Sequence, residues 1–111
     1  MIRGEVWTVQ DNQYASKPRP AVIVSVDSLK TDSVIVVMTT SEVNSNVPQR
    51  VRLGPSPENG LRNTCYAMAD KPMALRRQYL GYRIGELNDS QMSQISKGLA
   101  SVLGIVATDL I

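Results

Sequence analysis

The sequence predicts a small, mostly β barrel of five or six short strands followed by one helix. Short runs rich in β-branched residues alternate with stretches rich in Gly, Pro, Asn, Asp and Ser, which is typical of strands joined by turns. Helical periodicity is confined to the C-terminal part of the chain. Because 111 residues with six prolines and seven glycines allow only one modest core, we expect a single domain over residues 1–111.

The strands follow from the spacing of apolar residues. GEVWTV alternates, whereas AVIVSV and SVIVVMTT are nearly continuous apolar runs that favour buried strands. LGYRIGEL at 80–87 contains two glycines, which favours a short bent strand or a turn over a helix. The remaining predicted strands are QRVRL, with Val51 and Leu53 inward and Arg50 and Arg52 outward, and TCYAMAD at 64–70.

The helix has recognisable signals at both ends. Asn88 with Gln91 three residues later forms a potential capping box, and Gly104 is a typical C-terminal stop. Between them runs one apolar stripe that we expect to pack on the sheet, formed by Met92, Ile95, Leu99, Val102 and Leu103.

Composition excludes several kinds of chemistry. The chain has no histidine, so acid–base catalysis must fall to carboxylates, Arg, Lys, Tyr or hydroxyls. Its one cysteine, Cys65, cannot form an internal disulfide, and we expect it to be a small core residue. There is no plausible zinc ligand set, phosphate-binding glycine loop, nucleophile elbow or closely spaced carboxylate pair, and no cofactor is implied.

The apolar runs also bear on location. The longest are far shorter than the roughly 18 to 20 residues that a membrane span needs, and the N-terminus lacks the apolar stretch of a signal peptide. We therefore expect a cytoplasmic protein that does not contact a membrane.

Positive charge gathers in the second half of the chain, although the net charge is only +2. A basic surface next to tyrosines Tyr66, Tyr79 and Tyr82 would suit an anionic, base-bearing ligand such as RNA. The alternative is an ordinary solvated surface. The basic residues of this segment, whose only acids are Glu58 and Asp70, are Arg50, Arg52, Arg62, Lys71, Arg76, Arg77 and Arg83.

Polar residues stand at the ends of three predicted strands. Arg19 lies between Pro18 and Pro20, which restrict the backbone at the start of a strand. If these strands are neighbours, their ends would converge on an anion site, because guanidinium and hydroxyl groups both donate to phosphate oxygens. Each residue alone is better explained as a strand terminator or turn residue than as a catalytic group. The other two groups are Thr39-Thr40-Ser41 and Asp70-Lys71.

An ordered set of segments resembles one toxin family. RGEVW, KPRPAVIVS, VIVVMTTS, AMADKP and YLGYRIGELNDSQMSQISKGLASVLG are similar to the toxins MazF, PemK and Kid, in order from Arg3 to about Gly104. The resemblance implies an SH3-like barrel of the CcdB/PemK type with five to seven strands, usually a homodimer. It also implies metal-independent, sequence-selective cleavage of single-stranded RNA, whether mRNA, tRNA or rRNA, and inhibition by an antitoxin whose tail fills the RNA groove.

The resemblance also assigns residues. The family reaction, in which the ribose 2′-OH attacks the adjacent phosphorus, leaves a 2′,3′-cyclic phosphate and a 5′-OH. By position in the motifs, the strand-start arginine falls on Arg19 and the strand-end threonine on Thr40, with Ser41 beside it. The acidic residue before the late turn falls on Asp70. Arg19 would then stabilise the transition state, and Thr40 and Ser41 would bind the scissile phosphate.

Three positions depart from the family pattern. The loop DNQYASK lacks the usual Glu or His, so Tyr14, Gln13 and Lys17 are the candidates for RNA contacts there. The late motif of the family is commonly Asp-Gln, then an apolar residue or Pro, and then Arg, whereas this chain has Asp70-Lys71-Pro72-Met73 and so loses one basic residue. Met68 stands where one branch of the family has arginine. The missing loop acid leaves two alternatives open: a CcdB-like toxin that inhibits DNA gyrase without enzymatic activity, and an RNA-binding barrel without cleavage.

Overall fold

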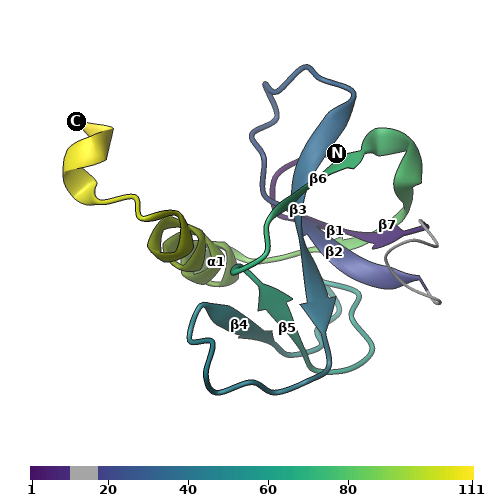
Figure 1. Cartoon of the computed structure of the whole chain (residues 1–111). Helices are drawn as coiled ribbons and strands as arrows, with labels where there is room; N and C mark the ends of the chain where they lie inside the picture. The colour runs from purple at the N-terminus through teal and green to yellow at the C-terminus, as the bar shows by residue number, and fades with distance from the viewer. Residues whose placement is uncertain (11–17) are drawn as a thin grey trace.

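Seven strands and one long helix build the molecule (Figure 1). The computed structural model describes residues 1–10 and 18–111. Two short 3-10 helices follow β6 and α1, at Arg77–Tyr79 and Ala107–Leu110. The main elements are β1 (Glu5–Val9), β2 (Arg19–Ile23), β3 (Ser33–Thr40), β4 (Arg50–Leu53), β5 (Cys65–Met68), β6 (Met73–Arg76), β7 (Leu80–Glu86) and α1 (Asp89–Leu103).

The strands pair antiparallel in the order β4-β5-β3-β2-β1-β7, and β6 pairs with β3. The central strand is β3, because it pairs with β2 on one edge and with both β6 and β5 on the other. Within residues 1–10 and 18–111 no ladder joins β4 to β7, so the barrel is not closed by hydrogen bonds. The predicted fold class, a mostly β protein with five to seven strands and a C-terminal helix, is confirmed.

Two apolar clusters fill the interior because the buried strands contribute side chains to both of their faces. One lies beneath α1 and includes Val6, Val22, Val37, Leu53 and Ile95, all fully buried. The other lies on the opposite face of the sheet and includes Ile23, Val34, Val36, Leu75 and Leu80.

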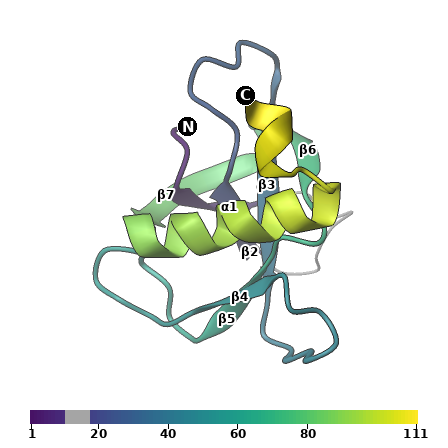
Figure 2. The same cartoon turned by 90° about the vertical axis from the view of Figure 1, so that its left-hand side faces the viewer.

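The helix begins and ends where the sequence predicts. Asn88 and Gln91 form the reciprocal capping box, and Gly104 ends the helix with a φ of +69°. Ile95 is fully buried, whereas Val102 and Leu103 are 37% and 60% exposed, so the last turn extends beyond the sheet (Figure 2). The expected packing of the whole stripe is therefore wrong at its C-terminal end.

Two further details differ from the sequence prediction. The strand β6, which was not predicted, pairs along the first half of β3. Arg50 does not face solvent freely as expected, because its side chain is only 11% exposed and is paired with Asp70.

In the described part of the chain, no helix is both long and apolar enough to cross a membrane.

Candidate functional site

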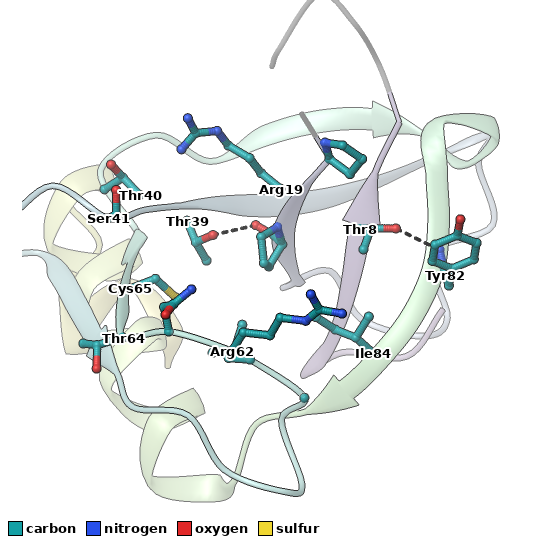
Figure 3. A pocket seen from close by; sticks show the side chains of 15 residues that line it. Thr8, Arg19, Thr39, Thr40, Ser41, Arg62, Thr64, Cys65, Tyr82 and Ile84 are labelled. Atoms are coloured by element: carbon teal, nitrogen blue, oxygen red, sulfur yellow. Dashed lines mark hydrogen bonds between the residues drawn. The ribbon is translucent and has the colours of Figure 1, made fainter. Parts of the chain in front are cut away.

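A pocket of about 550 Å³ opens between the ends of β2 and β3 on one side and β7 with the β4–β5 loop on the other (Figure 3). Two other pockets among the described residues are smaller, at about 390 and 450 Å³. Its lining consists of Thr8, Pro18, Arg19, Pro20, Thr39, Thr40, Ser41, Gly60, Leu61, Arg62, Asn63, Thr64, Cys65, Tyr82 and Ile84.

The pairing of β2 with β3 places Arg19 next to Thr40. Ala21 is opposite Met38, and extending this antiparallel register by two residues brings Arg19 opposite Thr40. Pro20 has no N–H for the ladder, and the Thr39 hydroxyl donates to the Pro20 carbonyl at 2.8 Å. The prediction that the first two strand ends converge is therefore met in the geometry of the pocket.

The electrostatics of the pocket are one-sided. Of the fifteen described lining residues, only Arg19 and Arg62 carry a charge, and both are arginines. Both side chains are exposed, and neither forms an ion pair with any residue in 1–10 or 18–111. Two guanidinium groups that have no ion-pair partner within the described residues share one hollow, and such a site attracts anions.

Hydroxyl groups complete the polar lining. The Thr40 hydroxyl oxygen accepts from the Glu42 N–H at 3.2 Å, which leaves its own proton free to donate to a ligand. Ser41 is exposed beside it. Thr8 holds the opposite rim, because its oxygen accepts from the backbone N–H of Tyr82 at 3.0 Å (Figure 3).

The cysteine of the pocket is not an activated nucleophile. Burial raises the pKa of the Cys65 thiol, against a smaller opposing effect of its hydrogen bond with Thr39. The thiol therefore stays protonated at neutral pH, whereas the reactive species would be the thiolate. Among the described residues, no group of three or more His, Cys, Asp or Glu is placed to hold a metal ion.

The third predicted strand end lies outside this pocket. The end of β3 meets the start of β5, since Thr40 is opposite Tyr66, whereas Asp70 lies in the turn after the far end of β5. Asp70 instead accepts from Arg50 at 3.1 Å. Burial alone would raise the pKa of Asp70, but hydrogen bonds from Arg50 and its own backbone, with the charges of Arg50 and Lys71, lower it from 3.8. Lys71 is exposed next to it.

Two of the predicted RNA-contacting residues, Tyr14 and Lys17, lie outside the described residues.

Two further residues of the pocket were identified from the structure alone. Sequence reasoning counted Arg62 only as one of many basic residues, and it did not single out Thr8. The only available signal for Arg62 was its position two residues after the turn-rich stretch GPSPENG, which does not reveal which strands that loop approaches.

Comparison with known proteins gives a consistent result. The profile of a family described as PemK-like, MazF-like toxin of type II toxin-antitoxin system matches residues 2–103. A relative from Mycolicibacterium smegmatis, named "Probable endoribonuclease MazF", is 30% identical over 107 residues, covering 95% of this chain and 98% of the relative.

Two solved structures are similar in both sequence and fold. A mycobacterial endoribonuclease in complex with its cognate antitoxin has a TM-score of 0.80 and 30% identity, covering 96% of this chain and 97% of its own. A second mycobacterial endoribonuclease has a TM-score of 0.78 and 31% identity, and the match covers 95% of this chain and 92% of the second endoribonuclease. The chain belongs to the family of PemK-like, MazF-like toxins of type II toxin-antitoxin systems, as its sequence motifs predicted.

Proposed function

We propose that this toxin is an endoribonuclease that cleaves single-stranded RNA in a sequence-selective, metal-independent way. The observation that carries the proposal is the charge of the pocket. Among the described residues that line it, Arg19 and Arg62 are the only charged ones. The names of the mycobacterial relatives, which are endoribonucleases, support the same activity.

The proposed reaction is transfer of the phosphodiester to the neighbouring 2′ oxygen. The 2′-OH loses its proton and bonds to phosphorus, the bond from phosphorus to the 5′ oxygen breaks, and that oxygen takes up a proton. The products are a 2′,3′-cyclic phosphate and a 5′-OH end, with no net gain or loss of protons.

In this mechanism Arg19 is the catalytic cation. Its guanidinium donates to the phosphate oxygens, whose negative charge grows as the five-coordinate transition state forms. The Thr40 hydroxyl, which the extended β2–β3 register places opposite Arg19, donates to the same group, and Ser41 binds beside it. None of the described residues that line the pocket carries a carboxylate. The main contribution of the described residues to catalysis is therefore stabilisation of the growing negative charge by these preorganised donors.

Further residues are proposed to contact the rest of the RNA strand. Tyr14 and Lys17 would act from the loop before β2, and Asp70 and Lys71 from the turn after β5. These two regions would extend the binding surface beyond the pocket, which is consistent with a substrate longer than one nucleotide.

The proposal includes partners and location. We propose that a cognate antitoxin silences the enzyme, because the similar mycobacterial endoribonuclease forms a complex with its own cognate antitoxin. We also propose that the toxin acts in the cytoplasm as a homodimer, which would cover exposed sheet edges. Sedimentation as a monomer at micromolar concentration would contradict the dimer.

The decisive experiment uses long unstructured RNA in EDTA and compares the wild-type protein with Arg19→Ala and Arg76→Ala. Arg76 is a matched control, because it is an exposed arginine opposite Ser33, at the far end of β3 from Thr40. We expect cyclic-phosphate ends with wild type and Arg76→Ala, and a rate lower by about a hundredfold or more with Arg19→Ala.

Two results would contradict the proposal. Intact RNA with wild-type protein would argue against nuclease activity, and gyrase inhibition and RNA binding would then be measured. Full activity of Arg19→Ala would refute the role of that residue. A substrate with a 2′-deoxy nucleotide at the mapped cut should resist cleavage, since it lacks the attacking hydroxyl.

A further inference from the structure

The loop between β4 and β5, residues 54–64, carries Arg62 to the pocket. Its sequence has two prolines and two glycines, which by itself indicates only a turn-rich connection. The structure shows that this loop crosses to β7 and forms one wall of the pocket (Figure 3).

The loop is held in one conformation by a buried asparagine. Asn59 is 1% exposed, and its side-chain oxygen accepts from the backbone N–H groups of Ser56 at 3.0 Å and Leu61 at 2.9 Å. Its side-chain amide donates to the Gly54 carbonyl at 2.9 Å. Leu61 is itself buried in the core beneath α1, so the residue preceding Arg62 is anchored.

Backbone contacts with β7 fix the loop further. A Cβ on Gly60, whose φ is +69°, would lie 1.9 Å from the Ile84 carbonyl oxygen. A Cβ on Gly85 would lie 2.3 Å from the Asn59 carbonyl carbon. The Glu86 N–H donates to the Glu58 carbonyl at 2.9 Å, which joins the two segments directly.

Arg62 differs from Arg50, Arg77 and Arg83 of the basic segment, which have structural partners. Arg52 and Arg76 also lack an ion-pair or hydrogen-bond partner in the described part of the chain, but they do not line this pocket. Arg83 donates to Glu5 at 2.6 Å, and Arg77 donates to the carbonyls of Leu29 and Thr31. Arg62 has no ion-pair or hydrogen-bond partner among residues 1–10 and 18–111, yet its backbone position is fixed. It lies across the pocket from Arg19 (Figure 3). Two like charges that face one hollow repel each other weakly in water, and an anion bound between or beside them would be attracted by both.

An exposed aromatic ring stands at the same pocket. Tyr82 is 66% exposed, and its backbone is fixed by the hydrogen bond of its N–H to Thr8. A ring held at the rim of a cationic pocket is suited to stacking with a nucleobase.

We propose that Arg62 and Tyr82 form a nucleotide subsite flanking the cleavage position, a deepening that rests on the proposed function. Arg62 binds a phosphate adjacent to the one held by Arg19, and Tyr82 stacks on the base of that nucleotide. Both act by positioning the strand, so they govern RNA affinity and KM, while Arg19 governs the chemical step.

The test measures cleavage and binding separately with Arg62→Ala, Arg62→Lys, Tyr82→Ala, Tyr82→Phe and the control Arg76→Ala. Binding is measured over a salt series with an RNA oligonucleotide that carries a 2′-deoxy nucleotide at the cut. We expect Arg62→Ala to raise KM and weaken binding about tenfold, with little change in kcat. Its slope of log affinity against log salt should become shallower by about 0.7, because one phosphate contact is lost.

The other variants separate charge from stacking. Arg62→Lys should restore the salt slope because the charge is retained. Tyr82→Ala should weaken binding about tenfold without changing the salt slope, and Tyr82→Phe should bind like wild type because the ring is retained. Circular dichroism and thermal midpoints should match wild type for Arg62→Ala, whose exposed side chain forms no hydrogen bond or ion pair with the described residues.

The outcomes distinguish this inference from the proposed function. Cleavage by wild type with unchanged KM and salt slope in Arg62→Ala would overturn the Arg62 assignment and leave the nuclease intact. Wild-type affinity in Tyr82→Ala would overturn the stacking assignment. Binding that depends on Arg62 and Tyr82, without any cleavage by wild type, would support the subsite and refute the nuclease.

Discussion

The Thr39 hydroxyl donates to the Pro20 carbonyl at 2.8 Å and so joins β3 to β2 at the point where both strands enter the pocket. Thr39 is 4% exposed. Both residues of this hydrogen-bonded pair are adjacent in sequence to a proposed catalytic residue, because Pro20 follows Arg19 and Thr39 precedes Thr40. A hydroxyl that acts on structure therefore determines how Arg19 and Thr40 are spaced.

Replacing Thr39 with valine should destabilise the protein by about 1 kcal/mol, because the shape is retained but one hydrogen bond is lost. RNA cleavage should fall by about tenfold or more as Arg19 and Thr40 lose their relative placement. Thr39→Ser keeps the hydroxyl and should retain most activity. Denaturant unfolding and cleavage rates check both effects, and equal activity of the valine and serine variants would contradict this role.

Gly60 and Gly104 provide a matched pair, since both have a φ of +69° but different surroundings. Gly104→Ala should cost only the backbone strain, about 1 kcal/mol, because a Cβ there meets nothing within 4 Å. Gly60→Ala adds a clash with the Ile84 carbonyl and should cost more than about 3 kcal/mol. Comparable unfolding free energies for the two variants would show that the contact of the β4–β5 loop with β7 is not tight.

The parts of the fold that sequence reasoning predicted are those specified by local signals. The bounds of β3 match the predicted run because its apolar stretch is continuous, and α1 is bounded by a capping box and a glycine. β6 was missed because MALR lacks clear alternation, and it becomes a strand by pairing with a free edge of β3.

The same distinction applies to the candidate site. Arg19 begins one recognisable strand and Thr40 ends the next, so their convergence was predictable if the two strands pair as antiparallel neighbours, and the family resemblance assigned both residues to the site. Arg62 was not assigned to the site because its place depends on contacts of Asn59 and Gly60 with distant backbone, which no local pattern encodes. The position of Asp70 likewise depends on β5 running antiparallel to β3.

Asp70 and Arg50 form a largely buried ion pair, with side-chain exposures of 18% and 11%. Asp70→Asn should lower the unfolding free energy by about 2 kcal/mol at neutral pH, because Arg50 loses a charged partner. The pKa of Asp70 is below its ordinary 3.8 in the folded state. The unfolded state therefore binds the proton more readily, so this stabilisation is full above about pH 5 and is lost as pH falls through the folded pKa.

Unfolding measured between pH 2 and 7 checks this prediction, with Glu42→Gln in an exposed loop as the control. The difference between wild type and Asp70→Asn should shrink at low pH, whereas the control should stay close to wild type throughout. The proposed RNA contact of Asp70 is tested separately by the affinity of Asp70→Asn at neutral pH, at a temperature where it remains folded. A stability difference that is independent of pH would contradict the ion-pair account.

Cys65 lines the pocket, yet burial raises the pKa of its thiol, so it should have no chemical role. Iodoacetamide at pH 7 should modify the native protein slowly and the denatured protein rapidly, since the reactive thiolate is scarce and enclosed in the fold. Cys65→Ala should cleave RNA within about twofold of the wild-type rate and lose about 1 kcal/mol of stability from a small cavity. A loss of activity as large as that of Arg19→Ala, at unchanged folding, would show instead that the thiol takes part in the reaction.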